Sequence, residues 1–324
     1  MRSREIEENN RESIDPRLLR IATHLRRIGL DVEIMRYPDE RRSVDILIRE
    51  KTLIKISEEA ENISSEEYRD LLASSLMLGT SPLVISDKIS GETLVSGIVF
   101  EKHSIRIVSE ETFIDYFSGK IVSIYEWKGS FYVKINSRAL REARERRGMR
   151  IGELAEILRV SKKTVYEYER GRIDPDIDHA EKLLELFGEE ILDNIDLLSE
   201  RLYQVDREKI LRRLSDKSSH EDPVARRINR AGLTAIKLWR TAPDIIGSYE
   251  DNTFTLVKED KSLSEREVLR KIREAIKFSQ YLRCKTYLLV DRFKKEIESR
   301  LKERDIEILD MNSLDRDLRS SLRR

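Results

Sequence analysis

The sequence predicts a chain of mixed class, in which two similar α/β domains flank a β-hairpin and a small all-α bundle. Helix and strand patterns alternate over residues 1–118, only short amphipathic helices occupy residues 137–200, and the alternation returns over residues 224–324. Alternating patterns are typical of α/β domains, and a run of short amphipathic helices is typical of a bundle. Residues 119–136 are the predicted hairpin, and residues 201–223 are a predicted connecting helix and linker.

Charge and cysteine content narrow the class of protein further. The 324 residues are enough for two or three domains that each bury a core. The 62 Lys and Arg residues balance 62 Asp and Glu residues, which argues against a nucleic-acid binder if the charge is evenly spread. The single cysteine, Cys284, excludes intrachain disulfides and a cysteine-rich zinc site. No apolar run approaches the roughly 20 residues of a membrane span.

The first α/β domain begins with an amphipathic helix over residues 16–28, because its apolar residues recur on one stripe, and Gly29 ends it. A second helix is predicted over residues 65–77. Short β-prone runs predict strands at residues 31–35, 43–48, 52–56, 82–85 and 105–108. The hairpin spans residues 121–135 and turns at Lys128-Gly129, where glycine supplies the positive φ.

The C-terminal part returns to the α/β pattern after a connecting helix at residues 202–214 and an exposed linker at residues 215–223. Helices are predicted at residues 224–230 and 264–282, and strands at residues 287–290 and 306–309. Trp127 and Trp239 are expected to pack in or beside a core.

The two α/β segments read as copies of one unit. Each has a helix closed by Gly-Leu, at Gly29 and at Gly232, and each has a strand that ends in lysine, Lys55 or Lys258. The glycine and the lysine are 26 positions apart in both segments. An internal repeat explains the common order and spacing. The alternative is that any two units with this order of helices and strands look alike.

The central segment carries the strongest motif. Ser137 is a candidate cap for a helix that Gly148 stops, and a second short helix is predicted over residues 152–158. Ser161 offers an N-cap hydroxyl for a third helix that runs from Lys162 to Arg170. A fourth helix is expected to begin at Asp176 or Asp178, and its apolar stripe includes Ala180, Leu183, Leu184 and Leu186.

This segment resembles the Cro/phage-repressor type of helix-turn-helix over residues 154–171, which read LAEILRVSKKTVYEYERG. The resemblance implies that the helix from Lys162 enters the DNA major groove by its N-terminal end. Lys162 and Lys163 contact either a guanine or a phosphate, two possibilities that the sequence leaves open, and the Thr164 methyl can touch thymine. The predicted DNA-binding residues are Arg150, Ser161, Lys162, Lys163, Thr164, Tyr166, Arg170 and Arg172.

The same resemblance implies that Arg144 and Glu169 form a structural ion pair, so that Glu169 does not contact DNA. This chain also departs from many relatives at one position. Where they have a glutamine at the start of the second helix, Ile151 stands here. The contact that this glutamine makes is therefore absent, and its share of the specificity is in doubt.

Charge is not evenly spread along the chain. Residues 134–172 contain 12 basic and 6 acidic residues, a net of +6, whereas residues 173–200 contain 10 acidic and 1 basic residue, a net of −9. The basic segment would neutralise DNA phosphates and make binding sensitive to salt. The acidic segment either orients the bundle or faces a partner, or else it is a solvated helix face.

The flanking domains resemble the restriction-endonuclease-like fold. In that family an aspartate and a second acidic residue, two positions before a lysine, hold magnesium for phosphodiester hydrolysis. Asp45 with Lys55, and Asp244 with Lys258, match the aspartate and the lysine. The acidic positions are Leu53 and Leu256, which cannot ligate a hard cation. We therefore expect degenerate domains with no metal, no cofactor and no catalytic activity, unless a carboxylate such as Glu50, Glu250 or Asp251 substitutes.

At the scale of the whole chain, the order of segments resembles helix-turn-helix transcriptional regulators of archaea. The likeness begins at VDI and LIKI, and continues through SGIVFEKHSIRIVSEETFIDYF and FYVKINSRALREARERRG. It implies a sequence-specific, double-stranded DNA-binding transcriptional regulator with no catalytic role. Such a protein is expected in the cytoplasm, associated with the nucleoid.

A homodimer is the expected form, because one helix-turn-helix reads only a few base pairs. The candidate dimer surfaces are the hairpin and the α/β domains. The alternatives are a nuclease or branched-DNA processing enzyme that uses the helix-turn-helix for targeting, and a protein-interaction scaffold or antitoxin-like partner. The sequence leaves the effector ligand open.

Overall fold

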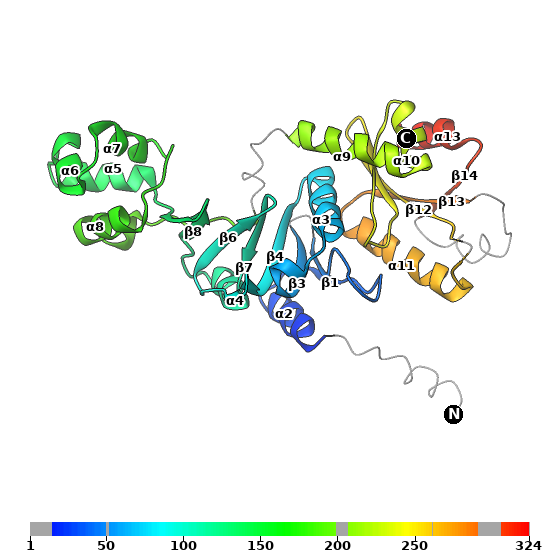
Figure 1. Cartoon of the computed structure of the whole chain (residues 1–324), viewed down its shortest axis with the longest axis horizontal. Coiled ribbons are helices and arrows are strands. Elements are labelled where there is room, and N and C mark those ends of the chain that lie inside the picture. The colour runs from blue at the N-terminus through cyan, green and yellow to red at the C-terminus, as the bar shows by residue number, and fades with distance from the viewer. Residues whose placement is uncertain (1–14, 50–51, 199–206, 261, 291–305, 324) are drawn as a thin grey trace. The chain divides into compact units, whose positions relative to one another are not determined.

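The computed structural model describes residues 15–49, 52–198, 207–260, 262–290 and 306–323 (Figure 1). The chain forms two compact units. Unit 1 contains residues 1–56, 63–82 and 198–324, and unit 2 contains residues 57–62 and 83–197. Among the described residues, no helix is both long and apolar enough to cross a membrane.

The N-terminal part of unit 1 is a helix, an antiparallel set of strands and a second helix. Helix α2 (Pro16–Arg27) starts where Asp15 accepts a hydrogen bond from the N–H of Arg17. Strands β1 (Val32–Ile34), β2 (Ile46–Ile48) and β3 (Thr52–Glu59) pair antiparallel in that order. Helix α3 (Ser65–Leu78) begins with a capping box of Ser64 and Glu67 and ends at Gly79, whose φ is 65°.

The C-terminal part of unit 1 forms a five-stranded sheet, β10-β11-β12-β13-β14. Strands β10 (Thr234–Lys237), β11 (Ile245–Tyr249) and β12 (Asn252–Lys258) are antiparallel, and β13 (Lys285–Val290) and β14 (Ile306–Asp310) are parallel to β12. One apolar cluster packs between this sheet and helices α10 (Pro223–Arg230) and α13 (Leu314–Leu322), and another packs under α11 (Glu265–Tyr281).

Unit 2 combines strands with the helical bundle. Strand β4 (Ser81–Ile89), which begins in unit 1, pairs with β5 (Glu92–Thr93) and β7 (Ile105–Val108), and β7 pairs with β6 (Ile98–Lys102). Strand β8 (Ile124–Trp127) joins β6 and forms a hairpin with β9 (Ser130–Val133). The turn lies at Lys128-Gly129, as predicted, and both residues have positive φ. The two remaining elements are α4 (Glu110–Phe117) and the short helix η1 (Ala60–Asn62).

The bundle of unit 2 consists of α5 (Ser137–Arg146), α6 (Ile151–Leu158), α7 (Lys162–Glu169), α8 (Ile177–Phe187) and the short helix η2 (Glu189–Ile191). Its core includes side chains from every one of these helices and from the hairpin. The N-cap of α5 is Asn136, not Ser137, because the Asn136 side chain accepts from the N–H of Ala139. Asp176 caps α8.

Apart from β5 and β6, which lie between β4 and β7 in the first fold, the two α/β folds share one order of helices and strands. The order α2-β1-β2-β3-α3-β4-β7-α4 corresponds to α10-β10-β11-β12-α11-β13-β14-α13. The two lysines, however, are not equivalent. The residue after each aspartate, Ile46 or Ile245, lies opposite Ile54 or Leu256 on the next strand. Lys55 comes one residue after Ile54, whereas Lys258 comes two residues after Leu256. Because successive side chains of a strand point to opposite faces, the two lysines point to opposite faces of their sheets. The shared spacing of 26 does not mark a shared site.

Three other features differ from the sequence predictions. The predicted exposed linker at residues 215–223 is mostly helical, since α9 (Arg207–Glu221) continues through it and buries Ser218. Trp127 and Trp239 are exposed, at 50% and 42%, with a lysine ammonium group over each ring and Tyr132 at the edge of Trp127. Short or isolated elements were missed, namely β5, β6, α4 and α13. Residues 199–206, which include the start of the predicted connecting helix, lie outside the described part of the chain.

Candidate nucleic-acid interface

Helix α7 is fixed in the bundle by its N-cap and by its buried face. Ser161 Oγ accepts a hydrogen bond from the N–H of Thr164 at 3.0 Å. Val165 and Tyr168 are buried in the bundle core, and burial raises the pKa of Tyr168 to about 12. Arg159, at the turn before the helix, has a φ of 58°. The turn and the cap set the direction in which the opposite face of α7 points.

That opposite face of α7 is polar and exposed. Lys162, Lys163, Tyr166 and Arg170 are exposed, and the Arg170 guanidinium lies 4.9 Å from the centre of the Tyr166 ring. A Cβ added at Gly152 would lie 3.0 Å from Lys162 Cε. The stem of Lys162 therefore crosses the first turn of α6, whereas the Thr164 hydroxyl lies 2.9 Å from Ser161 Oγ.

The remaining predicted contact residues lie at the edges of α6 and α7. Arg150 is exposed at the start of α6, and its backbone N–H donates to Glu153 at 2.7 Å. Arg172 follows α7 and pairs with Glu167 at 3.3 Å, with its side chain 61% exposed. Exposed pairs of this kind contribute little stability, so Arg172 is available to exchange Glu167 for a phosphate.

Arg144 and Glu169 form a bidentate ion pair inside the bundle. Arg144 Nη2 donates to Glu169 Oε2 at 3.0 Å, Nε donates to Oε1, and Nη1 donates to the carbonyl of Met149 at 2.6 Å. Both side chains are less than 10% exposed. The pair ties α5 to the end of α7, and it leaves neither charge free for a ligand.

The acidic segment after α7 fastens the bundle to the rest of unit 2. Asp174 accepts hydrogen bonds from the Tyr125 hydroxyl at 3.0 Å and from Lys134 Nζ at 3.2 Å. Asp196 accepts from the Tyr116 hydroxyl at 2.9 Å. Burial, with Asp196 beside the hydroxyl, raises the pKa of Tyr116 to about 12. These bonds favour an orienting role for the segment over a merely solvated face.

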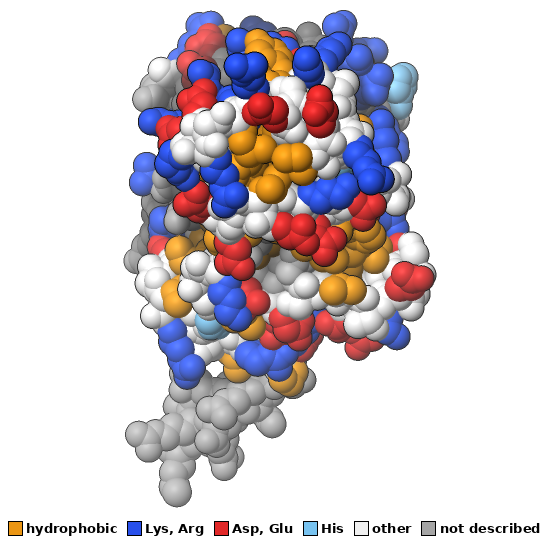
Figure 2. Space-filling view, turned by 90° about the vertical axis from the view of Figure 1, so that its left-hand side faces the viewer, with side chains coloured by type: hydrophobic (Ala, Val, Ile, Leu, Met, Phe, Trp, Pro, Cys, Tyr) orange, Lys and Arg blue, Asp and Glu red, His pale blue; other side chains and the backbone are white. Residues whose placement is uncertain are grey.

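Figure 2 shows one face of the molecule in space-filling form. On this face Lys and Arg side chains lie next to Asp and Glu side chains in the upper part as well as in the lower part, with hydrophobic side chains between them. The separation of charge along the sequence is therefore not visible in this view as two patches of opposite sign.

The position that resembles an endonuclease site in the first α/β fold is filled by ion pairs. Asp45 is buried and accepts from the N–H of Ile56 at 2.8 Å and from Arg42 Nε at 3.1 Å. Lys55 Nζ lies 3.3 Å from Asp45 and 3.3 Å from Glu67. The ammonium group thus stands between the two carboxylates, in the place that a bridging cation would need.

The corresponding position in the second α/β fold is built from different residues. Asp244 accepts from the N–H of Lys258 at 2.7 Å and pairs with Lys271 of α11 at 2.7 Å. Lys258 turns to the other face of the sheet and pairs with Asp222. Leu53 and Leu256, two positions before each lysine, are fully buried, and so is Thr255, which the strand register makes the counterpart of Leu53. These donor sets do not fit magnesium, which prefers several oxygen ligands.

Sequence reasoning missed Glu67 and Lys271, because both lie on helices far from the motif. Glu250 and Asp251, two of the proposed substitutes, lie at the turn between β11 and β12, and Glu50 is outside the described residues. No group of three or more His, Cys, Asp or Glu residues that suits a metal occurs in the described part of the chain.

The two α/β folds also contact each other reciprocally within unit 1. Helix α3 packs against β11, and α11 packs against β2. Asp70 of α3 accepts from the N–H groups of Trp239 and Arg240 at 2.7 and 2.6 Å. Glu274 of α11 accepts from the N–H of Arg36 at 2.6 Å. Each long helix therefore holds, by a buried carboxylate, the segment that follows the first strand of the other fold.

Two family models match this chain at the positions that the geometry indicates. A PD-(D/E)XK superfamily domain matches residues 17–122, and a helix-turn-helix matches residues 140–193. An endonuclease-like fold joined to a Cro/repressor-type bundle defines a DNA-binding regulator.

Relatives identify the particular family. A "Putative HTH-type transcriptional regulatory protein" of Aeropyrum pernix is 31% identical over 86% of this chain and 87% of its own length. One of Sulfurisphaera tokodaii, with the same name, is 32% identical over 85% and 90%. The chain belongs to this family of archaeal HTH-type transcriptional regulatory proteins. A search of solved structures finds no match.

Proposed function

We propose that this protein binds specific double-stranded DNA sequences by inserting the N-terminal half of α7 into the major groove. The observation that carries the proposal is the exposed pair Lys162 and Lys163 beside the capped start of α7. An exposed cation at a helix N-terminus that a rigid core supports is positioned to donate to guanine or to phosphate. A regulator of this kind would be found with the nucleoid.

Genome-wide footprinting with the purified chain would supply an operator, and fluorescence anisotropy would then measure binding of variants to it. Lys162→Ala and Lys163→Ala should each weaken binding. A lysine that reads a base should cost about 1–3 kcal/mol and relax the sequence preference, whereas a lysine that contacts phosphate should reduce the salt slope by about 1.

Arg138→Ala is the matched control, because Arg138 is an exposed cation of the same bundle that lies outside the predicted contact set. Gly152→Ala adds a second test, since the new methyl group would displace the stem of Lys162. Unchanged binding by the Lys162→Ala, Lys163→Ala double variant would contradict the choice of α7.

We also propose that the active form is a homodimer that pairs through the hairpin. The contacts of α3 with β11 and of α11 with β2 already occupy one face of each α/β fold within the chain. Trp127 and Phe131 of the hairpin are 50% and 40% exposed. Light scattering should give a dimer, and Trp127→Ser with Phe131→Ser should give a monomer. A monomeric wild-type chain, with and without DNA, would contradict this assembly.

A third proposal is that the endonuclease-like folds do not cleave DNA. It is supported by Leu53 and its counterpart Thr255, which replace the acidic residue, and by Lys55 between Asp45 and Glu67. The test is a nicking assay on plasmid and branched DNA with magnesium or manganese. Metal-dependent products that disappear in Asp45→Ala would establish a nuclease instead.

A further inference from the structure

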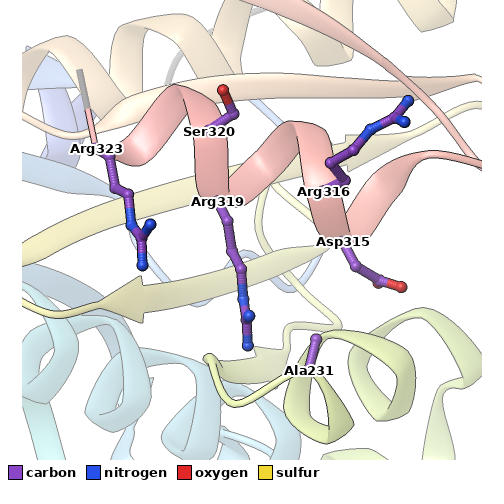
Figure 3. Close-up of a pocket in the computed structure, with 6 residues that line it drawn as sticks. All are labelled: Ala231, Asp315, Arg316, Arg319, Ser320 and Arg323. Carbon is purple, nitrogen blue, oxygen red and sulfur yellow. The ribbon is translucent and has the colours of Figure 1, made fainter.

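A cavity of about 580 Å³ in the C-terminal α/β fold is lined mainly by arginines. It lies between α13 and the end of α10, and its lining residues are Ala231, Asp315, Arg316, Arg319, Ser320 and Arg323 (Figure 3). Arg319 and Arg323 extend from the same side of α13, because they are four residues apart on one helix. Figure 3 shows both side chains reaching down from the helix toward the level of Ala231.

The acidic residue in the lining does not neutralise these arginines. Both carboxylate oxygens of Asp315 accept from Arg227 Nε, at 3.0 and 2.9 Å, so this acid is already paired. Arg316 lies at the rim and has a neighbour of its own in Asp317 at 3.3 Å. Arg323 also interacts electrostatically with Glu250, which lies outside the lining, so the positive charge of the interior comes mainly from Arg319.

Arg319 is the most unusual of the lining residues. Its Nε is enclosed and has no hydrogen-bond acceptor among the described residues. Its guanidinium lies 5.8 Å from the centre of the Tyr249 ring, and the guanidinium of Arg323 lies 5.7 Å from the same ring. Arg323 donates to the Tyr249 hydroxyl at 2.8 Å. The ring holds both guanidinium groups in place but offers them no negative charge.

Enclosed donors without an acceptor are costly, and a charged donor is more so. An arginine fork pairs best with an oxyanion that accepts two parallel hydrogen bonds, and phosphate oxygens serve more than one fork at once. The cavity volume falls in the range of small-ligand sites, about 300–1,000 Å³. These properties together describe a site for a phosphate group.

We propose that Arg319 and Arg323 bind a phosphate group in this cavity, which would give the regulator a second anion site besides α7. The phosphate can come from a free nucleotide or pyrophosphate, or from the backbone of DNA. In either case the Nη atoms of both arginines donate to phosphate oxygens, and Ser320 lies at the edge.

Calorimetry on the full chain with pyrophosphate and with ATP tests the free sources. A short duplex that lacks the operator sequence, titrated at several salt concentrations, tests the DNA backbone. Arg319→Gln and Arg323→Gln should each lose affinity about tenfold or more, because each removes charge-assisted hydrogen bonds. Arg273→Gln, an exposed arginine of α11, is the matched control and should bind like the wild type.

Loss of pyrophosphate or ATP binding in the two variants identifies a free phosphate as the ligand. A smaller salt slope on the duplex, without binding of free phosphates, identifies the DNA backbone. Arg319 should also be protected from phenylglyoxal by the ligand in the wild-type chain, a readout that needs no variant. Failure of the wild type to bind free phosphates, together with unchanged duplex binding by both variants, would overturn the proposal.

Discussion

The two α/β folds place an aspartate at the same point of an antiparallel hairpin, but they surround it with different charges. Asp45 precedes β2 and shares Lys55 with Glu67, while Arg42 adds a second cation. Asp244 precedes β11 and pairs with Lys271, while Lys258 points to the other face and pairs with Asp222. The first group contains two acids and two bases in one network, and the second contains two separate pairs.

The two folds therefore share an order of helices and strands without sharing the chemistry of a site. Backbone pairing keeps the N–H bonds to each aspartate, from Ile56 in one fold and from Lys258 in the other. The two lysines have equal spacing in the sequence but pair with different carboxylates. In both folds the aspartate oxygens accept from a backbone N–H and from a cationic side chain.

The largest expected effect comes from removing one aspartate at a time. Asp244→Ala leaves Lys271 with a side chain only 8% exposed and without its carboxylate, so we expect a local loss of about 3–5 kcal/mol. Asp45→Ala leaves Lys55 paired with Glu67, and we expect about 1–2 kcal/mol. Hydrogen-exchange mass spectrometry on the β11–β12 and β2–β3 peptides measures each loss separately, which suits a chain of two units.

Restoring the balance provides the control for this comparison. Adding Lys271→Met to Asp244→Ala removes the unpaired cation and should recover much of the protection. Equal losses in the two single variants would contradict the distinction between a shared network and a separate pair.

The next effect concerns the carboxylates that cross between the folds. Burial raises the pKa of Asp70 from its usual 3.8 to about 7, against the opposing effect of the N–H groups of Arg240 and Trp239. Because the folded state holds this proton more tightly than the unfolded state, the contribution of Asp70 to the free energy of unfolding is greatest below about pH 4. This contribution decreases as the pH rises to about 7. The size of the pKa shift limits this decrease in the free energy of unfolding to roughly 4 kcal/mol.

Asp70→Asn should flatten this part of the pH profile, measured as hydrogen-exchange protection of α3 and of residues 239–243 between pH 4 and 7 after correction for intrinsic rates. Glu274→Gln, the reciprocal position, is the matched control, and the slope should remain in it because Asp70 still titrates. A slope that persists in Asp70→Asn would show that another group is responsible.

The smallest effect concerns packing at equivalent strand positions. Ile48 faces Thr52 in the first fold, and Gly247 faces Phe254 in the second. A Cβ at Gly247 would lie 2.4 Å from the Phe254 ring and 2.5 Å from the carbonyl oxygen of Thr234. Gly247→Ala should therefore cost about 1–3 kcal/mol by overpacking. Ile48→Val, which only removes a methylene, should cost about 0.5–1.5 kcal/mol.

Thermal unfolding monitored by circular dichroism would rank the two variants. A double variant, Gly247→Ala with Phe254→Leu, should relieve only the overlap with the ring and recover stability in part at most, because the close contact with the Thr234 carbonyl remains and Phe254 is itself buried. If Gly247→Ala alone proves neutral, the strand has room for a methyl group at this position, and the prediction of overpacking is wrong.

Elements with a strong apolar periodicity, or with clear capping residues and glycines at their ends, were predictable from the sequence. The helices α2, α3 and α7 and the turn at Lys128-Gly129 follow from apolar stripes, caps and glycines that act within a few residues. The short strands β5 and β6 were missed, because β5 has only two residues and β6, although it pairs with β7 and β8, buries only one of its five residues. Residues 215–221 were predicted as a linker from their polar composition, but they are helical because α9 packs against α3 and α10. The DNA-contact residues remain a prediction.

By itself, the sequence determined the fold class, the helix-turn-helix, the loss of the acidic position at Leu53 and Leu256, and the separation of charge behind a net of zero. These are local properties of residue type and spacing. Only the tertiary structure decided that Glu67 shares Lys55 with Asp45 and that Lys271 pairs with Asp244. It also decided that Lys55 and Lys258 point to opposite faces of their sheets, and that Asp70 and Glu274 link the two folds. Those outcomes depend on strand register and on contacts between distant segments, which short-range patterns do not specify.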